Sequence, residues 1–280
     1  MLQDTIFSFS MKVCGQKQDA EDTMQEVLLK SISILPRFDN PRALVVWLYK
    51  VAKTRCLMSR RRSKFVPQET LSLEELMPDR RELERIPADR EGTPEWTFLR
   101  RENAKRLRAA LQKLPPDYRL IIVLHDMEEL SDEDIAEITG LRAGTIRVRL
   151  HRARLFLRKE LAKGELARAP KKQKHGREGI QVSTHRRRRS CKEMFAEISD
   201  YLDDQLDDSL CAELEKHMDS CEPCQAFLKS LEISIEQCRR APNEPPDPAR
   251  AAKFRRELLA QYQQAMSNAI SRRRTAAPLD

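Results

Sequence analysis

Residues 131–161 constrain the fold more than any other stretch, because their pattern is that of two helices joined by a glycine turn. Ser131, with Asp134 three residues later, is a helix start signal. Apolar residues then follow at helical spacing: Ile135, Ile138 and Leu141. Gly140 ends the first helix, since the left-handed conformation at a helix C-terminus favours glycine. With Ala136 as the small residue and Ile146 as the β-branched anchor, the spacing predicts a helix-turn-helix.

The second helix is expected from about Ala143 to Leu161, with one apolar face and one basic face. Its core-facing residues are Ile146, Leu150, Ala153 and Leu157. Its arginines are expected on the surface: Arg147, Arg149, Arg152 and Arg154. Arginine reads guanine edges or grips phosphates, which indicates DNA binding; the alternative is a solvated basic face on an ordinary helical hairpin. His151 is expected to be a polar surface group or a phosphate contact.

The composition of the 280 residues favours an all-α chain. Aromatic residues make up 5% and glycine occupies 7 positions, which argues against a β-sandwich or barrel. The formal net charge of +8 suits a polyanionic partner, although it would also suit a membrane surface. No apolar run approaches the roughly 18 residues of a membrane span, and no secretory signal is visible, so we expect a cytoplasmic protein without a membrane span.

Residues 19–35 predict an amphipathic helix near the N-terminus. Its polar face carries Asp22, Gln25 and Glu26, which could be a simple solvated face. After a short loop, a further helix is expected from Ala43 to Arg62. This helix mixes aromatic and basic side chains: Trp47, Tyr49, Lys50, Lys53 and Arg55. Such a mixture suits single-stranded DNA, because bases stack on rings while cations follow phosphates; Trp47 taken alone is more often a core residue.

Two segments interrupt the helical pattern and divide the chain. Residues 66–95 contain four prolines, and residues 166–190 carry nine bases against one acid, so both are predicted to be linkers. The charge then reverses, with thirteen acids and five bases in residues 191–240. We therefore predict helical domains at 1–65 and 96–165, an acidic module at 191–240, and a Pro-rich break with a tail helix (249–270) within 241–280.

The acidic module has the spacing of a metal site. His217, Cys221 and Cys224 follow the pattern His-x3-Cys-x2-Cys, and on one helix these offsets share a face, so three soft ligands converge. Tetrahedral Zn²⁺ takes a fourth ligand, for which Cys191 is the best candidate. A module this small buries little surface, and a zinc ion would supply the stability that its core lacks.

The cysteines also allow other interpretations. Seven cysteines in a cytosolic chain argue for metal or redox chemistry before structural disulfides. The cluster could be a set of buried thiols beside a surface histidine, or its Cys-x2-Cys could be a thioredoxin-like motif, although no βαβ pattern surrounds it. Cys211 and Cys238 are expected not to be ligands.

Residues 5–162 resemble the extracytoplasmic-function class of bacterial sigma factors. The similarity to sigma region 2 lies in two segments, Asp19-Ala-Glu-Asp-Thr-Met-Gln-Glu-Val and Trp47-Leu-Tyr-Lys-Val-Ala. Region 4 is similar to Leu114-Pro-Pro-Asp-Tyr-Arg, Ser131-Asp-Glu-Asp-Ile-Ala and Gly144-Thr-Ile-Arg-Val-Arg-Leu-His-Arg-Ala-Arg. The resemblance implies a promoter-recognition subunit of RNA polymerase, which is not an enzyme.

The same resemblance implies roles for individual residues. Asp22, Gln25 and Glu26 would dock on core RNA polymerase. The −10 element would be read by Asn40, Arg42, Trp47, Lys50, Lys53 and Arg55. The −35 element would be read by Arg142, Thr145, Arg147, Arg149, Arg152 and Arg154. The acidic linker at 66–95 would thread the polymerase in place of nucleic acid.

The C-terminal module resembles the zinc-binding anti-sigma fold, through Cys191-Lys-Glu-Met-Phe-Ala and His217-x3-Cys221-x2-Cys224. In that family the module packs against sigma regions 2 and 4 and blocks polymerase binding, which implies an intramolecular contact and inhibition in cis. The opposite charges on one tether favour this hypothesis. A subordinate hypothesis is oxidation of Cys221 or Cys224 with release of zinc. The alternatives are a stand-alone zinc-containing helix-turn-helix regulator and a thiol oxidoreductase.

Overall fold

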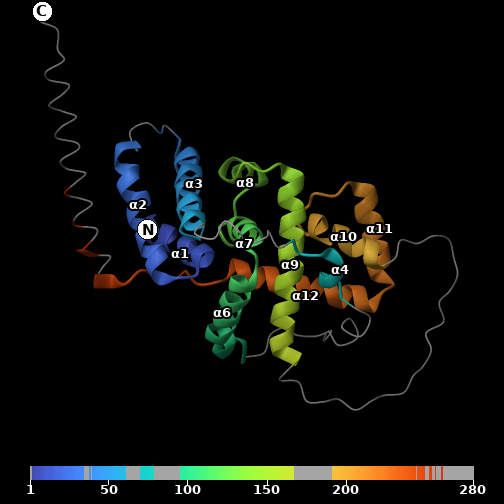
Figure 1. Ribbon diagram of the computed structural model, residues 1–280. Helices are drawn as coiled ribbons and strands as arrows, with labels where there is room; N and C mark the ends of the chain where they lie inside the picture. The colour runs from blue at the N-terminus through green and yellow to red at the C-terminus, as the bar shows by residue number, and fades with distance from the viewer. Residues whose placement is uncertain are drawn as a thin grey trace, which may run out of the picture. The chain divides into compact units, whose positions relative to one another are not determined.

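The part of the chain that the computed structural model describes consists of helices and the turns that join them (Figure 1). The described residues are 2–34, 38, 40–60, 70–78, 95–166, 191–243 and 245–249, with 252, 253, 256 and 260. None of them lies in a strand, which confirms the all-α prediction. The basic linker (166–190) and the predicted tail helix (249–270) lie almost entirely outside these residues.

The chain divides into two compact units, each built from separate segments. Unit 1 comprises Met1–Gln68, Val123–Arg142 and Pro242–Asp280. Unit 2 comprises Glu69–Ile122 and Ala143–Ala241. The domain limits proposed from the sequence follow the chain order instead, and they stay predictions.

Unit 1 is built on three helices that contact one another, α1 (Leu2–Cys14), α2 (Lys17–Ile34) and α3 (Pro41–Arg60). Gly15, with a φ of 78°, makes the left-handed turn between α1 and α2. The unit also contains the π-helix η2 (Val123–Met127), which contacts α1, and α8 (Asp132–Thr139), which contacts α3. Its buried core includes Phe7, Phe9, Met24, Val27, Val46, Leu48 and Ala52.

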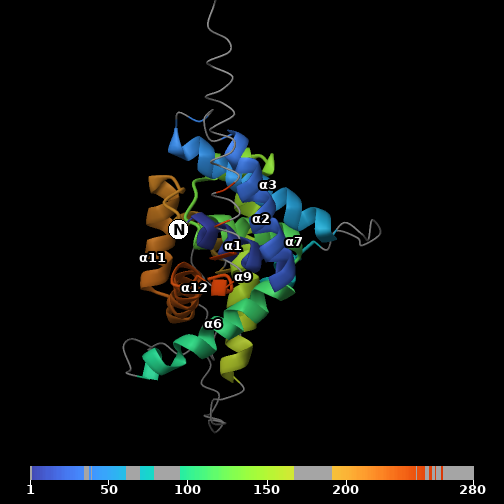
Figure 2. The ribbon, with the colours of Figure 1, turned by 90° about the vertical axis from the view of Figure 1, so that its left-hand side faces the viewer.

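Unit 2 surrounds one long helix, α9 (Ala143–Leu166), which extends past the predicted end at Leu161. Four helices contact α9 from earlier and later in the chain (Figure 1): α4 (Leu73–Leu76), α6 (Glu95–Lys113), α7 (Pro116–Ile122) and α10 (Cys191–Leu202). The helix α12 (Glu222–Arg239) contacts α9 as well and lies beside α11 (Asp208–Asp219) (Figure 2). The C-terminal module therefore packs directly on the predicted DNA-reading helix.

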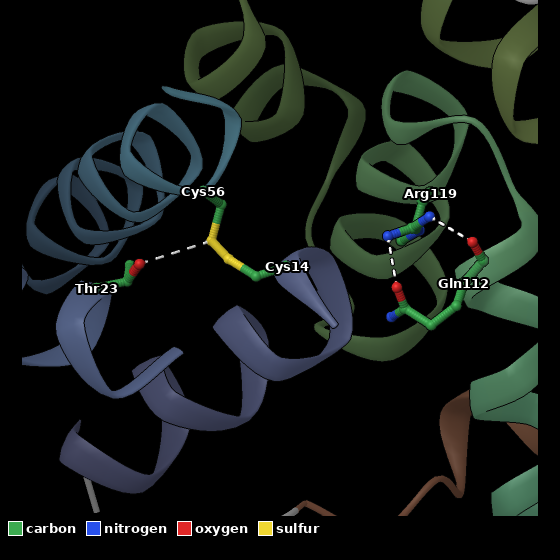
Figure 3. The surroundings of a disulfide bond; sticks show 5 residues. All are labelled: Cys14, Thr23, Cys56, Gln112 and Arg119. Carbon is green, nitrogen blue, oxygen red and sulfur yellow. Dashed lines mark hydrogen bonds between the residues drawn. A yellow bond between two sulfur atoms is a disulfide. The ribbon is translucent and has the colours of Figure 1, made fainter. Parts of the chain in front are cut away.

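Local signals explain where several of these helices begin and end. The Ser131 hydroxyl accepts a hydrogen bond from the Asp134 amide, and Gly140 has a φ of 75°, so both predicted ends of α8 are confirmed. Asp207 caps α11 by accepting from the amides of Ser209 and Leu210. The buried Arg119 joins α7 to α6, because its guanidinium donates to the Gln112 side chain and carbonyl, each at 2.8 Å (Figure 3).

Among the described residues, no helix combines the length and the apolar character that crossing a bilayer requires.

Candidate metal centre and recognition helix

The four residues predicted to bind zinc come together in unit 2. The ligand atoms of Cys191, His217, Cys221 and Cys224 all lie within 4.8 Å of one another. His217 Nε2 is 3.6 Å from Cys191 Sγ and 3.2 Å from Cys224 Sγ, and the Cys221 and Cys224 sulfurs are 3.3 Å apart. A tetrahedral Zn²⁺ with three sulfur ligands and one nitrogen holds these atoms about 3.5–3.8 Å apart, so the cluster fits the ion closely.

The route by which these ligands converge differs from the prediction. His217, Cys221 and Cys224 do not share one helix, because α11 ends at Asp219 and α12 begins at Glu222. Pro223 lies in the first turn of α12, where a missing amide hydrogen costs nothing. The expectation of a single continuous helix was therefore wrong, and the ligands meet across a turn. Cys191 joins them from the first residue of α10.

Burial raises the pKa of the Cys191 and Cys224 thiols above their ordinary values. A thiol must lose its proton to bind a metal ion, so a buried thiolate cluster needs a cation to balance its charge. The remaining cysteines of the module lie outside the cluster: Cys211 is half-buried in α11, and Cys238 is buried near the end of α12.

The apolar interior of unit 2 joins the metal cluster to α9. Its core comprises Leu76, Leu155, Phe195, Ile198, Cys224, Phe227, Leu231 and Ile235. Cys224, one of the four predicted zinc ligands, thus shares a core with Leu155 of α9 and with Leu76 of α4, which lies in the predicted linker. The position of α9 is consequently tied to the integrity of the metal cluster.

Two residues of α9 that were expected on the surface are buried, which corrects the prediction. Arg154 is 1% exposed, and its guanidinium pairs with the carboxylate of Asp203 through bonds of 2.7 and 2.8 Å. His151 is 7% exposed, and its Nδ1 lies 2.8 Å from the hydroxyl of Ser199. Periodicity identified the apolar face of α9 that is buried in unit 2, but it contained no sign that a second face is covered by α10.

The other predicted −35 residues differ in their contacts. Arg147 donates to Gln205 at 2.8 Å, and Arg149 lies 3.3 Å from an Asp117 carboxylate oxygen, so both are engaged. Arg142 and Thr145 are exposed, and Arg152 is half-buried. Within the part of the chain that the structure describes, no side-chain hydrogen bond or ion pair involves these last three residues.

The residues predicted to read the −10 element lie in unit 1, and the side chains of two of them contact α8. The Arg42 guanidinium pairs with Asp134 at 2.7 Å, and Lys53 donates to the carbonyl of Ile138 at 2.6 Å. Asn40 accepts from the Arg42 amide at 2.8 Å and so lies at the start of α3. The remaining three differ in exposure: Lys50 and Arg55 are exposed, and Trp47 is half-buried against Phe38.

The predicted polymerase-binding residues lie along α2, with Asp22 exposed and Gln25 and Glu26 half-buried. Glu26 forms ion pairs with Lys30 and with Arg55 of α3. The ion pair thereby joins a residue predicted to read the promoter to a residue predicted to bind polymerase.

Unit 1 also contains a feature that the sequence did not predict, a disulfide between Cys14 and Cys56 (Figure 3). The sequence interpretation favoured metal or redox chemistry over structural disulfides. The cysteine cluster of the module agrees with it, but the Cys14–Cys56 pair does not. The spacing of 42 residues carries no recognisable pattern, so only the packing of α1 against α3 reveals it.

Sequence reasoning also missed the residues of the module that hold α9: Ser199, Asp203 and Gln205. The acidic charge of the module indicated a basic partner, but charge alone could not select Asp203 among thirteen acids. Leu76 was likewise passed over inside the linker, although Leu71, Leu73 and Leu76 hint at a short apolar helix.

Comparison with protein families identifies three segments in chain order. The model described as "Sigma-70 region 2" matches residues 1–66, and "Sigma-70, region 4" matches residues 104–157. The model described as "Putative zinc-finger" matches residues 191–225, which include all four clustered ligands.

Curated relatives cover the first two segments. ECF RNA polymerase sigma factor SigE of Mycolicibacterium smegmatis is 33% identical over 57% of this chain, and the chain spans 58% of that relative's length. ECF RNA polymerase sigma factor SigW of Bacillus subtilis is 31% identical over 57% of this chain and 84% of its own length. A co-crystal structure of sigma factor RpoE with anti-sigma factor NepR from Bartonella quintana matches 57% of this chain and 92% of that chain, at 23% identity and a TM-score of 0.41.

The two sigma segments occur in the family's order, and SigW is matched over most of its length. A stand-alone regulator is not favoured by these matches. The chain therefore belongs to the extracytoplasmic-function family of RNA polymerase sigma factors, which are transcription initiation factors and not enzymes.

Proposed function

We propose that this sigma factor directs core RNA polymerase to −35 and −10 promoter elements, and that its own zinc-binding module holds it inactive. The observation that carries the proposal is the docking of the module on α9 through the buried Arg154–Asp203 ion pair. The module and the recognition helix belong to one compact unit, so inhibition needs no second protein.

The size of the DNA major groove explains why this contact would block promoter binding. A helix with its side chains is about 10–12 Å across, and the groove is about 12 Å wide, so the groove admits one helix only. Here α10 and α12 already contact α9. The module also engages basic side chains of α9, since Arg147 donates to Gln205, which lies between α10 and α11, and the Arg158 guanidinium lies 4.3 Å from the ring centroid of Phe227 in α12.

The module would hold the linker as well as the recognition helix. Leu76 of α4 is buried in the core shared by α9 and the module, and Lys159 of α9 donates to the Glu75 carbonyl at 2.6 Å. The Leu71 amide donates to the Tyr118 hydroxyl at 3.3 Å. A linker that must thread the polymerase would first have to leave this site, which adds a second barrier to activation.

Zinc would act as the support of this inhibited arrangement. Cys191, His217, Cys221 and Cys224 would hold one Zn²⁺, and that ion would supply stability to a module with a small core. Because Cys224 lies in the core that contains Leu155 and Leu76, the ion would stabilise the surface on which α9 and the linker rest.

Unit 1 provides a parallel case of engaged DNA-binding residues. Asp134 and the Ile138 carbonyl bind Arg42 and Lys53, two residues proposed to read the −10 element. Promoter binding would require these contacts to be exchanged for contacts with DNA.

The test is transcription by purified core polymerase from a pool of randomised promoters. Three full-length proteins are compared: the wild type, Asp203→Asn and Asp204→Asn. The second variant is a matched control, because Asp204 is the next residue, is exposed and forms no ion pair with α9 among the described residues. We expect D203N to raise specific initiation at least about fivefold, a typical size for coupling between sites, and D204N to match the wild type.

The outcomes separate the two parts of the proposal. Equal initiation by the wild type and D203N, at a common promoter sequence, would retain the sigma function and remove the inhibitory role of the module. No initiation by any of the three folded proteins with competent core polymerase would remove the sigma function itself.

A further inference from the structure

The disulfide of unit 1 lies next to the residues proposed to bind polymerase and promoter. Cys14 is the last residue of α1, and Cys56 lies in α3, immediately after Arg55. The disulfide therefore joins α1 to the helix that carries the proposed −10 residues. Because Arg55 pairs with Glu26 of α2, the disulfide also lies close to a proposed polymerase contact. Figure 3 shows the two sulfurs between α1 and α3, with Thr23 of α2 alongside.

The surroundings of the bond are closely packed. Cys14 and Cys56 are each 1% exposed, and the Thr23 hydroxyl lies 3.9 Å from the Cys56 sulfur. The Cα atoms of the two cysteines are 5.4 Å apart, a separation common in native disulfides. Nearer the middle of the same two helices, the rings of Phe9 and Tyr49 meet edge to face, with centroids 4.8 Å apart. The covalent bond therefore reinforces one end of a helix pair that packing holds along its middle.

We propose that Cys14 and Cys56 form a reversible dithiol–disulfide site that sets the affinity of the sigma factor for its partners, with dithiols and their disulfides as its substrate class. The proposal rests on the proposed function, because a factor that works on RNA polymerase meets the reducing compartment where transcription takes place. Disulfides in that compartment are rare, and those that occur are usually transient, catalytic or redox-sensing.

The exchange is chemically balanced. A thiolate of an external dithiol attacks one sulfur of the Cys14–Cys56 bond, forms a mixed disulfide, and releases the other cysteine, which takes up a proton. The second thiol of the reductant then displaces the remaining cysteine. Two electrons and two protons pass to the cysteine pair, and the reductant becomes a disulfide; an external disulfide drives the reverse reaction.

Burial determines how this exchange would proceed. An attacking thiolate needs access to a sulfur that is 1% exposed, so exchange waits for a local opening of α1 from α3. Cys14 ends its helix and precedes the turn at Gly15, which makes the C-terminal end of α1 the place where opening is easiest. Reduction is accordingly slow in the folded chain and fast once unit 1 unfolds.

The bond also determines which redox state binds better. Holding α3 against α1 removes motion that binding would otherwise have to restrict, and preorganisation of this kind raises affinity. The disulfide form is therefore the form that binds core polymerase more tightly, and reduction weakens binding.

This site is separate from the metal cluster, whose cysteines lie in unit 2. A reductant keeps metal-binding thiols in the state that zinc needs, so reduction of the Cys14–Cys56 bond leaves the zinc content unchanged. Zinc content thus serves as an internal control for the origin of any redox effect.

The experiment uses the full-length protein equilibrated in buffers of reduced and oxidised dithiothreitol. Differential alkylation and peptide mass spectrometry report the state of each cysteine, zinc content is measured in parallel, and binding of fluorescent core polymerase is titrated in each buffer. The double variant Cys14→Ser with Cys56→Ser is fixed in the dithiol-like state, and Cys211→Ser is the matched control. Reduction of the wild type tests the same bond without any substitution, in case the double variant folds poorly.

We expect Cys14 and Cys56 to be protected from alkylation until the buffer is reducing, and polymerase binding to fall about fivefold or more on reduction. The double variant should bind like the reduced wild type in both buffers, and C211S should respond like the wild type. Free Cys14 and Cys56 thiols in the oxidising buffer, or binding that is unchanged or stronger after reduction, would overturn the proposal. Because the module is proposed to hold the full-length protein inactive, the titrations are repeated in an Asp203→Asn background. If that form does not bind polymerase either, the proposed sigma function fails, while the alkylation pattern still decides whether the disulfide forms and reduces.

Discussion

Arg154 in α9 and Asp203, which directly follows α10, form a two-bond ion pair with an Nη1–Oδ2 distance of 2.7 Å and an Nη2–Oδ1 distance of 2.8 Å. The Arg154 side chain is fully buried, and that of Asp203 is 14% exposed. A buried charge whose partner is removed is strongly destabilising, because it remains out of water without compensation. This pair therefore makes the docking of the module on α9 specific, and it removes Arg154 from contact with DNA.

Replacement of Asp203 by Asn should loosen the module without unfolding it. The loss of a charge-assisted hydrogen bond to Arg154 should lower the free energy of unfolding by about 2 kcal/mol, and Asp204→Asn should change it by less than about 0.5 kcal/mol. Urea denaturation measures both values, and backbone hydrogen exchange along α9 should be faster in D203N only. Equal exchange in the two variants would contradict a role for this pair in docking.

Leu76 should contribute to stability as a core residue although it lies in a predicted linker. It is 5% exposed and packs in the core with Leu155 and Phe227, so Leu76→Ala should cost about 2–4 kcal/mol. Glu75→Ala on the same short helix is the control, because that side chain is exposed and its carbonyl contact with Lys159 survives. Denaturant unfolding of the full chain compares the two variants. Similar small losses in the free energy of unfolding would contradict a core role for Leu76.

Removal of one zinc ligand should abolish metal binding and release α9. Cys224→Ser should lose the single equivalent of zinc that we expect in the wild type, since one thiolate and its charge are lost. Cys211→Ser should retain the metal. A zinc-specific dye measures the metal content, and hydrogen exchange in α9 reports the release. Full zinc content in C224S would count against the predicted ligand set.

The module should also release α9 as the pH falls, because His151 is held neutral. Burial, together with the nearby charges of Arg154 and Arg152, lowers the pKa of His151 to about 4. The unfolded chain, with an ordinary histidine pKa near 6.5, takes up the proton first. Stability is therefore complete above about pH 6.5 and declines between about pH 6.5 and 4, by up to about 3 kcal/mol.

His151→Gln tests this pH dependence, since a neutral side chain has no proton to gain. Urea denaturation at several pH values between 4 and 7 should give a smaller slope of stability against pH for H151Q than for the wild type. Identical slopes would show that another group controls the acid response.

Asp134→Asn should free Arg42 for the −10 element. The Arg42 side chain is 60% exposed, and its partner Asp134 raises its pKa. An exposed pair adds little to stability, but this one engages a side chain that is proposed to contact DNA. We expect D134N to bind a single-stranded −10 oligonucleotide more tightly by about twofold to fivefold, with thermal stability near that of the wild type. Glu137→Gln removes an equal charge from an exposed position of the same helix, and Glu137 acts on Arg42 only through a weaker Coulombic attraction, so this control should change binding less than D134N does.

Much of the local structure follows from the sequence, because local patterns report the properties of a single helix. The cap at Ser131, the turn at Gly140 and the buried stripe of Ile146, Leu150 and Ala153 depend on residues within a few positions of one another. The spacing of His217, Cys221 and Cys224 likewise predicted which side chains meet, although a turn and not one helix brings them together.

The tertiary structure alone decided which partner covers each remaining face. Arg154 meets Asp203 across 49 residues, and Cys14 meets Cys56 across 42, with no repeating pattern between the members of either pair. When two faces of a helix are both able to pack, the periodicity of the sequence shows only whether each face is apolar or charged. Which face is buried depends on contacts formed when distant segments fold together. In α9, those contacts place the zinc-binding module on a face that was predicted to read DNA.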